Sequence, residues 1–415
     1  MADENGVPLQ VLDKGVHNFN AGPDFLEASV KLGAIIWSGQ IEIHVKASDW
    51  QSHGHSGNPD YENVILHVVW ENDFALRRKD GTEIPALVLK GRVNEALLET
   101  YESLQQSRQA IFCSRFLDSV NEVYRTSWLD RALLNRLDRK GEKILSLYAN
   151  TKSWEETAYQ WLFMTFGMKV NQEPFLLLAQ RIPFRILQKA SHEQALMESL
   201  LLGMAGFLEE KSDNPYYRSL QRNFSFLAHK YGITEQRLER KVWRFHRIRP
   251  SNSPVVRLLQ LASILFRMPT SLFNLLTQTK DLQRIREAFA TTSHRFEELN
   301  RENPFPQLNR HYSTGRMFLN HLTVNFASPY LMCYGREKSN QAIVDRSVRF
   351  LEETIPEKNR IVQQWENAGV CAKNASDSQA LIEQYNEFCL KKRCEECLVG
   401  QQLFAAKHAG EPSAH

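Results

Sequence analysis

The stretch that decides the fold of the N-terminal part of the chain reads GPDFLEASVKLGAIIWSGQIEIHVKASDWQSHGHSGNPDYENVILHVVW (residues 22–70). Residues 25–32 alternate between apolar and polar side chains, and residues 40–46 do so again after a turn at Gly33. Alternation with a period of two is the pattern of a half-buried strand, so these two segments predict a hairpin. Residues 64–70 are almost continuously apolar, which indicates a strand covered on both faces.

The composition is that of a soluble protein with more than one domain. The chain has 415 residues, of which 42% are hydrophobic and 24% are charged, and this length favours two or three domains. The net charge of +3 gives no overall argument for a nucleic-acid partner, so a basic binding surface would have to be local. No apolar run is long enough to span a membrane, and the polar N-terminus shows no signal peptide. We therefore expect a cytoplasmic protein with no membrane partner.

The pattern changes at about residue 92 from strand-like to helical. Ser153 and Glu156 have the spacing of a capping box at the start of one predicted helix. Apolar residues recur at intervals of three and four in residues 93–106, 128–148, 153–167 and 192–210. We predict an α+β protein with a small, β-rich mixed α/β domain over residues 1–92, a large all-α domain over 93–400 and a flexible tail over 401–415.

Acidic and basic side chains gather where the predicted hairpin brings its strands together. Asp24 precedes the first strand, and Glu42, His44 and Lys46 lie on one face of the second. Cross-strand neighbours lie about 4.5–5.5 Å apart at Cβ, and two carboxylates at that separation repel unless a cation or a proton lies between them. Carboxylate oxygens suit Mg²⁺ or Mn²⁺. We expect Asp24 and Glu42 to hold such an ion, with His44 or Lys46 orienting or deprotonating a water molecule.

Histidines of the same stretch offer a second way to hold a metal. Five of the chain's 13 histidines lie within residues 17–67. His53 and His55 flank a glycine in a loop and could converge with His44 and Asp60 on Zn²⁺ or another transition metal. His53 and His55 are therefore further candidate ligands. Both sets also have simpler explanations, because a Pro-Asp turn with a solvated strand face accounts for the first and solvated loop histidines account for the second.

A basic stretch lies in the helical part of the chain, at residues 237–257 (RLERKVWRFHRIRPSNSPVVR). Cationic side chains can neutralise phosphates and interleaved aromatic rings can stack on bases, so this stretch could bind DNA or RNA. A solvated helix face explains the same pattern. The candidate nucleic-acid ligands are Arg240, Arg244, Arg247, Arg249 and Arg257, of which the first three would share one face of a helix.

Three cysteines lie within nine residues near the C-terminus, at Cys389, Cys394 and Cys397. Cys-x2-Cys lets two thiolates bind one ion from a turn, and the longer Cys-x4-Cys-x2-Cys spacing resembles that of plant-type ferredoxins. A fourth ligand would come from Cys371, Cys113 or a histidine. We expect a metal here, with zinc favoured over an iron–sulfur cluster. Unligated cysteines at a helix end are the alternative.

Five motifs together resemble an uncharacterised bacterial family known only as a domain of unknown function: HNFNAGPDFLEASV, WSGQIEIHVKASDWQSHGH, YENVILHVVW, RIRPSNSPVVRLLQLA and YNEFCLKKRCEECLVG. The similarity extends over essentially the whole chain. Its members usually begin with a further helical segment, which we expect to be missing or replaced here. Pro23-Asp24 followed by Glu42 is also similar to the PD-(D/E)xK pattern of restriction-endonuclease-like nucleases. The lysine of that pattern is replaced by His44, and the nearest lysine is Lys46.

These patterns lead to one principal hypothesis and two rivals. The principal hypothesis is a metal-dependent nuclease that hydrolyses phosphodiester bonds of DNA or RNA at Asp24 and Glu42, with the basic stretch following the phosphate backbone. The first rival is a non-catalytic scaffold or binding protein with a structural metal site. The second rival is a hydrolase of another substrate built on a His/Asp metal centre.

Overall fold

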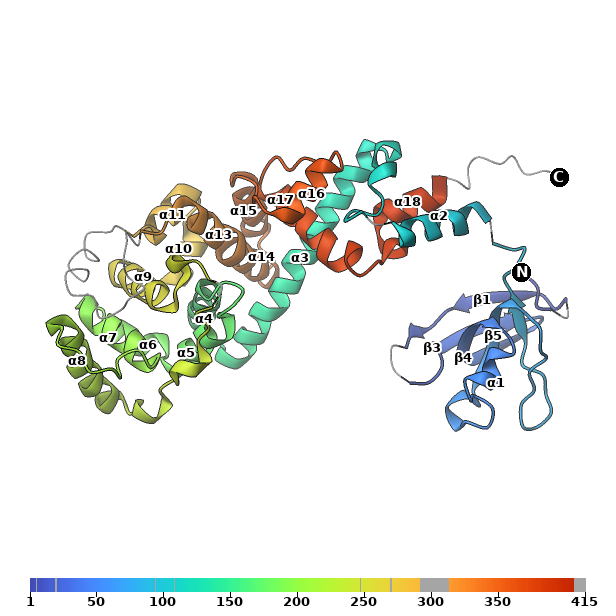
Figure 1. The fold of residues 1–415 in the computed structure, drawn as a ribbon, viewed down its shortest axis with the longest axis horizontal. Helices are drawn as coiled ribbons and strands as arrows, with labels where there is room; N and C mark the ends of the chain where they lie inside the picture. The colour runs from blue at the N-terminus through green and yellow to red at the C-terminus, as the bar shows by residue number, and fades with distance from the viewer. Residues whose placement is uncertain are drawn as a thin grey trace. The chain divides into compact units, whose positions relative to one another are not determined.

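The computed structural model describes residues 1–4, 6–18, 21–93, 95–107, 109–246, 248–268, 271–291 and 313–406 (Figure 1). The chain forms two compact units: the first holds residues 1–107 and the C-terminal segment from Gln402 onward, and the second holds residues 108–401. A mixed sheet makes up most of the first unit and helices make up the second, which confirms the predicted α+β class. The first residues of the predicted tail belong to helix α18 (Leu398–Ala406), and residues 407–415 lie outside the described residues.

In the described part of the first unit, six strands form one mixed sheet: β1 (Leu9–Asp13), β2 (Val16–His17), β3 (Phe25–Leu32), β4 (Ile35–Lys46), β5 (Val64–Glu71) and β6 (Ala86–Val88). Their order is β1-β3-β4-β5-β6, with β2 also paired to β3. β3 and β4 pair antiparallel, which confirms the predicted hairpin. Gly33 occupies its turn with a φ of +57°, in the left-handed region that favours glycine. β4 with β5, and β5 with β6, are parallel.

The parallel pairing of β4 and β5 positions the candidate site. Parallel strands cannot be joined by a tight turn, so the chain must cross back along the sheet before it enters β5. The connecting segment contains a short helix, α1 (Asp49–Ser52), and a 3-10 turn, η1 (Pro59–Tyr61). Trp50 and Tyr61 are 5% and 9% exposed and belong to one apolar cluster with Val64 at the start of β5. This packing holds the crossover against the sheet.

Near the C-terminal end of β4, two polar side chains are buried and two apolar side chains are exposed, the reverse of the usual arrangement. Glu42 and His44 are 5% and 8% exposed, whereas Ile43 and Val45 are 44% and 67% exposed. Ile41 is the residue of this segment that enters the apolar core of the sheet. The crossover encloses the polar side chains instead of the apolar ones. Burying polar groups costs free energy unless they are hydrogen-bonded or paired, so this enclosed polar face is the part of the first unit that requires a chemical explanation.

The described part of the second unit is almost entirely helical (Figure 1). A large apolar core holds the helices together, with Phe163, Leu201 and Leu261 fully shielded from solvent. Helix α2 (Glu95–Gln106) lies in the first unit. The helices that follow are α3 (Glu122–Thr151), α4 (Trp154–Phe166), α5 (Gln172–Arg181), α6 (Phe184–Lys189), α7 (Gln194–Met204), α8 (Pro215–Tyr231), α9 (Pro254–Arg267), α10 (Leu272–Gln278), α11 (Leu282–Phe289), α13 (Arg316–Leu322), α14 (Ser328–Glu337), α15 (Gln341–Glu352), α16 (Arg360–Asn367) and α17 (Ala375–Gln384).

One four-residue segment, Ser153–Glu156, caps three helices of the second unit. The Ser153 hydroxyl accepts the N–H of Glu156 at 3.3 Å and so caps α4, as predicted. The Glu155 carboxylate accepts the N–H groups of the first two residues of α10 at 2.9 and 3.2 Å. The Glu156 carboxylate accepts the N–H of Phe184 at 3.0 Å, at the start of α6, rather than turning back to Ser153 as a capping box would. Negative charge is stabilising at a helix N-terminus, so this segment links three helices.

Among the described residues, no single helix has both the length and the apolar character needed to cross a membrane. α9 and α10 meet those requirements only as a pair, and the pair is bent by 73°.

Replacing Glu155 by alanine is expected to destabilise the second unit. The change removes two charge-assisted hydrogen bonds from the N-terminus of α10, and because Glu155 is partly exposed we expect a loss of about 1–3 kcal/mol in the free energy of unfolding. Urea unfolding followed by far-UV circular dichroism measures this loss. The control is Glu142→Ala, at an exposed position of α3, which should change the free energy by less than about 0.5 kcal/mol. Equal effects of the two substitutions would contradict the capping role.

Candidate metal centre

Two hydrogen bonds link the segments of Asp24 and Glu42 across the open end of the β3–β4 hairpin. Glu42 accepts the N–H of Asp24 at 3.0 Å through Oε2, and Asp24 accepts the N–H of Ile43 at 2.9 Å through Oδ2. The register explains this exchange, because Phe25 pairs with Ile41 and their neighbours therefore lie opposite each other. The bond to Oε2 leaves the other oxygen of Glu42, Oε1, facing the histidines of the crossover.

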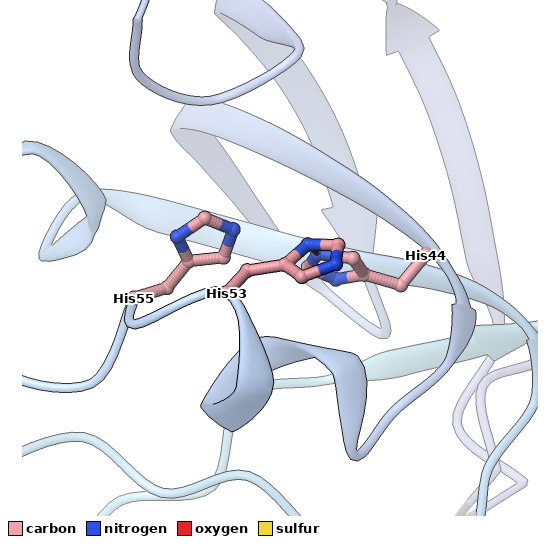
Figure 2. Close-up of side chains that lie close together, drawn as sticks. All are labelled: His44, His53 and His55. Atoms are coloured by element: carbon pink, nitrogen blue, oxygen red, sulfur yellow. Dashed lines mark hydrogen bonds between the residues drawn. The ribbon is translucent and has the colours of Figure 1, made fainter.

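Three histidines lie close together beside this oxygen, and Figure 2 shows their side chains. His44 comes from β4, His53 directly follows α1, and His55 lies two residues further along the crossover. One ligand atom from each can be chosen so that all three lie within 4.8 Å of one another. His44 Nε2 is 3.2 Å from His53 Nδ1, and Glu42 Oε1 is 3.2 Å from His55 Nε2 and 3.5 Å from His44 Nε2. Three imidazoles thus lie around one point, with the Glu42 carboxylate against two of them, and this group could hold a metal ion.

His67 on β5 fixes the orientation of His44. It is 1% exposed, and its Nε2 lies 2.8 Å from Nδ1 of His44. With the proton of His44 on Nδ1, this nitrogen donates to His67, and Nε2 presents its lone pair to His53 and Glu42. A hydrogen bond on the far nitrogen of a metal-binding histidine is the usual way in which proteins set its tautomer and orientation.

Aromatic rings enclose the histidines on one side. Trp50 lies edge-on to His55 and to His67, with ring centroids 5.5 and 5.4 Å apart. Tyr61 stacks on His55 with centroids 3.9 Å apart and an interplanar angle of 17°. These contacts restrict the rotation of the rings and exclude water from that side, so the imidazoles are held in place before any ligand binds.

Burial favours the neutral form of His44, His55 and His67 and weakens the acidity of Glu42. Burial and then the neighbouring histidines lower the pKa values of His44 and His55, and the same causes lower the pKa of His67 to about 4. Burial and then the negative charge of Asp24 raise the pKa of Glu42 to about 7, although the bond from the Asp24 N–H opposes this shift. Neutral imidazole is the form that binds metals. A divalent cation would supply the positive charge that a buried Glu42 carboxylate requires.

Lys46 and Asp60, which belonged to the predicted sets, are outside this group. Lys46 is exposed at the end of β4, and its N–H donates to Oδ2 of Asp49 at 2.9 Å. Asp60 is exposed, and its N–H donates to the side chain of Asn58 in the turn before η1. The structure therefore brings together Asp24, Glu42, His44, His53 and His55.

A cleft of about 320 Å³ opens beside the group. His55 and Tyr61 line it, together with Phe74 and the basic run Arg77–Lys79. Phe74 is 40% exposed. Arg77 is exposed and forms no ion pair with any residue that the structure describes, so its guanidinium can contact a ligand in the cleft.

The basic stretch in the second unit does not form a helical face. The described residues 240–246 and 248–252 contain two short 3-10 turns, η4 (Arg240–Val242) and η5 (Pro250–Asn252), so the α-helix predicted to align Arg240 and Arg244 is wrong. Trp243 explains the irregular path, because it is buried and donates to the carbonyl of Ala205 at 2.8 Å, which pulls the segment into the core.

The arginines of this stretch have different surroundings. Arg240 pairs with Glu210. Arg257 is 4% exposed, with its guanidinium 3.4 Å from the centroid of the Phe318 ring, so it packs inside the unit. Arg244 and Arg249 are exposed and keep their place as candidate phosphate ligands, whereas Arg247 lies outside the described residues.

The three C-terminal cysteines lie in the second unit near a fourth. Cys389 and Cys397 are buried, and Cys394 is half-buried. Cys113 is close enough that, after burial, Cys397 and Cys394 raise its pKa, to about 12. Cys371 is exposed. Of the residues considered for the fourth position, the structure brings Cys113 to the group.

Sequence reasoning missed two parts of the site in the first unit. His67 is the one polar residue of the apolar run 64–70, and a polar side chain inside a doubly covered strand indicates a buried partner. The run Arg77–Lys79, ahead of the Asp80-Gly81 turn, is a local positive charge in the same unit. Both features can be seen in the sequence, but the sequence does not show which residues His67 and these cationic side chains contact.

Comparison with known proteins gives a family and no function. Residues 1–360 match the family described as "Protein of unknown function (DUF2851)". No curated protein and no solved structure matches the chain. The matched region includes the candidate metal centre and ends before Cys389.

Replacing His53 by alanine is expected to weaken metal binding in the first unit, because it removes one of three imidazole ligands. We expect one Mn²⁺ per chain in the unaltered protein and an affinity lower by on the order of 100-fold or more in the variant. Isothermal titration with Mn²⁺, which suits oxygen and nitrogen ligands better than thiolates, measures this. His229→Ala, at an exposed position of α8, is the matched control. An affinity equal to that of the control would exclude His53 as a ligand.

The metal affinity is expected to increase with pH until about pH 7, where Glu42 loses its proton. Below that pH the ion must displace this proton, so the apparent affinity falls by up to about tenfold per pH unit. His44 and His55 add little, because their pKa values are lowered. The same titrations in Glu42→Gln should show weaker binding with a flatter pH profile. An unchanged slope would mean that another group releases the proton.

Proposed function

Since the chain belongs to the DUF2851 family, described only as proteins of unknown function, we propose its function from the chemistry of its site. The proposal is a metal-dependent hydrolase that cleaves phosphodiester bonds of nucleic acid. One observation carries it: three imidazoles lie around one point, the Glu42 carboxylate contacts two of them, and a cleft with cationic and aromatic side chains lies beside them.

The ligand set fits Zn²⁺ or Mn²⁺ better than Mg²⁺. Imidazole nitrogen suits transition metals, whereas Mg²⁺ prefers oxygen ligands and keeps several water molecules. When bound, such an ion lowers the pKa of a water ligand and polarises a phosphoryl oxygen. The residues that would hold it are His44, His53, His55 and Glu42.

Asp24 and His67 act as positioning residues in this proposal. The N–H of Asp24 binds Oε2 of Glu42 and thereby directs Oε1 to the ion. With the proton of His44 on Nδ1, that nitrogen donates to Nε2 of His67, which directs Nε2 of His44 to the same point. Because the groups around the ion are already oriented, little reorganisation is needed when the reaction begins.

The cleft favours a nucleic acid as the substrate. Lys79 pairs with Glu62 and Arg78 donates to the carbonyl of Val64, so Arg77 is the side chain of this run that can supply positive charge for a phosphate. The exposed ring of Phe74 offers a surface on which a base can stack. Stacking tolerates every base, so we expect little sequence preference. Unpaired bases reach such rings more readily than bases inside a duplex, so single strands should be the better substrates.

A protein-binding role is the second candidate, and the exposed apolar row along β4 favours it. Ile35, Ile36 and Trp37 are 61%, 59% and 40% exposed at one end of the strand, and Ile43 and Val45 are exposed at the other. Exposed apolar patches are typical of interaction surfaces. In this case the metal would only fix the crossover to β4, and binding would occur without cleavage.

A cleavage assay distinguishes the two candidates. The protein is incubated with single- and double-stranded DNA and RNA in the presence of Mn²⁺, Zn²⁺ or a chelator. We expect cleavage of single strands with metal, none with chelator, and rates lower by on the order of 100-fold in His53→Ala and Glu42→Gln. His229→Ala should retain the full rate. Metal binding without cleavage of any of the substrates would overturn the hydrolase proposal in favour of the binding role.

A further inference from the structure

Four cysteines of the second unit converge although they come from distant parts of the sequence. Cys389, Cys394 and Cys397 follow α17, and Cys113 precedes α3. The ammonium group of Lys392 lies 5.5 Å from the centroid of the Phe112 ring, which places the segment before Cys113 against the cysteine-bearing loop. We infer that these four cysteines bind an iron–sulfur cluster.

The mutual influence of the thiols supports a common site. Besides burial, Cys397 and Cys394 act on Cys113, and all three act on Cys389. Burial alone would be unremarkable, because a free cysteine is often a small core residue. Four thiols that influence one another need a further explanation, because packing of an apolar core does not require four cysteines at one place. Four is the number of cysteine ligands that [2Fe–2S] and [4Fe–4S] clusters take.

The backbone around the cysteines departs from a regular α-helix at several points. A π-helical turn, Tyr385–Cys389, ends α17, and a left-handed residue, Lys392 with a φ of +55°, reverses the chain toward Cys394. A Cβ on Gly400 would lie 1.9 Å from the carbonyl oxygen of Cys394, so only glycine permits this close approach at the start of α18.

Donors point at the sulfur of Cys397. The Gln384 amide donates to Sγ at 3.0 Å, and the N–H groups of Val399 and Gly400 are directed at the same sulfur. Hydrogen bonds to sulfur stabilise cysteine ligands in the thiolate form and tune a bound cluster.

The spread of the sulfurs fits a cluster better than one zinc ion. A tetrahedral zinc with bonds of about 2.3 Å holds its sulfurs about 3.8 Å apart. Among the described residues, the histidine group of the first unit is the set with ligand atoms all within 4.8 Å, and the cysteine sulfurs do not form such a set. In a [4Fe–4S] cluster each cysteine binds a different iron, and in a [2Fe–2S] cluster two cysteines bind each iron. In neither case do three sulfurs need to lie as close together as they do around one zinc. The prediction that zinc is favoured at Cys389, Cys394 and Cys397 is therefore replaced by a cluster that includes Cys113.

The test is a measurement of iron, acid-labile sulfide and zinc per chain in the full-length protein purified without oxygen, together with its visible absorption. We expect equal amounts of iron and sulfide and a broad visible absorption. Four irons per chain would indicate a [4Fe–4S] cluster and two would indicate [2Fe–2S]. Stoichiometric zinc without sulfide would overturn the inference. So would a chain that takes up neither iron nor sulfide on reconstitution with ferrous iron and sulfide.

Two matched variants test the ligand set. Cys113→Ser should lose the visible absorption and most of its iron, whereas Cys371→Ser, at an exposed cysteine, should keep both. Far-UV circular dichroism checks that each variant remains helical, and the metal and sulfide content of the unaltered chain does not depend on either variant. Retention of the full cluster in Cys113→Ser would exclude Cys113 as a ligand. None of these measurements depends on nucleic-acid cleavage, so this inference and the proposed hydrolase can fail separately.

Discussion

The parallel pairing of β4 with β5 is the constraint on which the N-terminal unit depends. It excludes a tight turn and requires a crossover, and the crossover carries His53 and His55 back over the polar face of β4. If β5 had followed β4 in a hairpin, Glu42 and His44 would lie on an open strand face in contact with water. The candidate metal centre is therefore a consequence of sheet topology as much as of residue type.

Enclosure of this polar face gives its side chains their chemistry. A carboxyl group in this position can hold a proton or a cation, and its pKa of about 7 means that the two alternatives compete near neutral pH. The same burial keeps His44 and His55 in the neutral form that binds metals. An arrangement that costs folding free energy in the absence of an ion is thus well prepared to bind one.

The two proposed metal centres differ in both donor atoms and enclosure. The first offers imidazole and carboxylate groups beside a cleft, and His53 is exposed to solvent. The second offers thiols, with Cys389 and Cys397 buried. Imidazole and carboxylate ligands suit zinc or manganese, and thiolate ligands suit iron–sulfur clusters. An open position beside the metal is typical of catalytic sites and a closed ligand shell is typical of structural ones, so the proposed reaction belongs to the first unit.

The sequence by itself determined the α+β class, the hairpin that places Asp24 beside Glu42, and the cap at Ser153, because alternation, turn residues and cap spacing are properties of neighbouring residues. It also identified every side chain of the histidine group as a candidate ligand. Only the tertiary structure decided that His53 and His55 join Glu42 and His44, that His67 orients His44, and that Cys113 lies near the C-terminal three. It also decided that the basic stretch is irregular, since burial of Trp243 prevails over the local pattern. These outcomes depend on strand direction and on packing between distant segments, and periodicity along the chain carries no information about either.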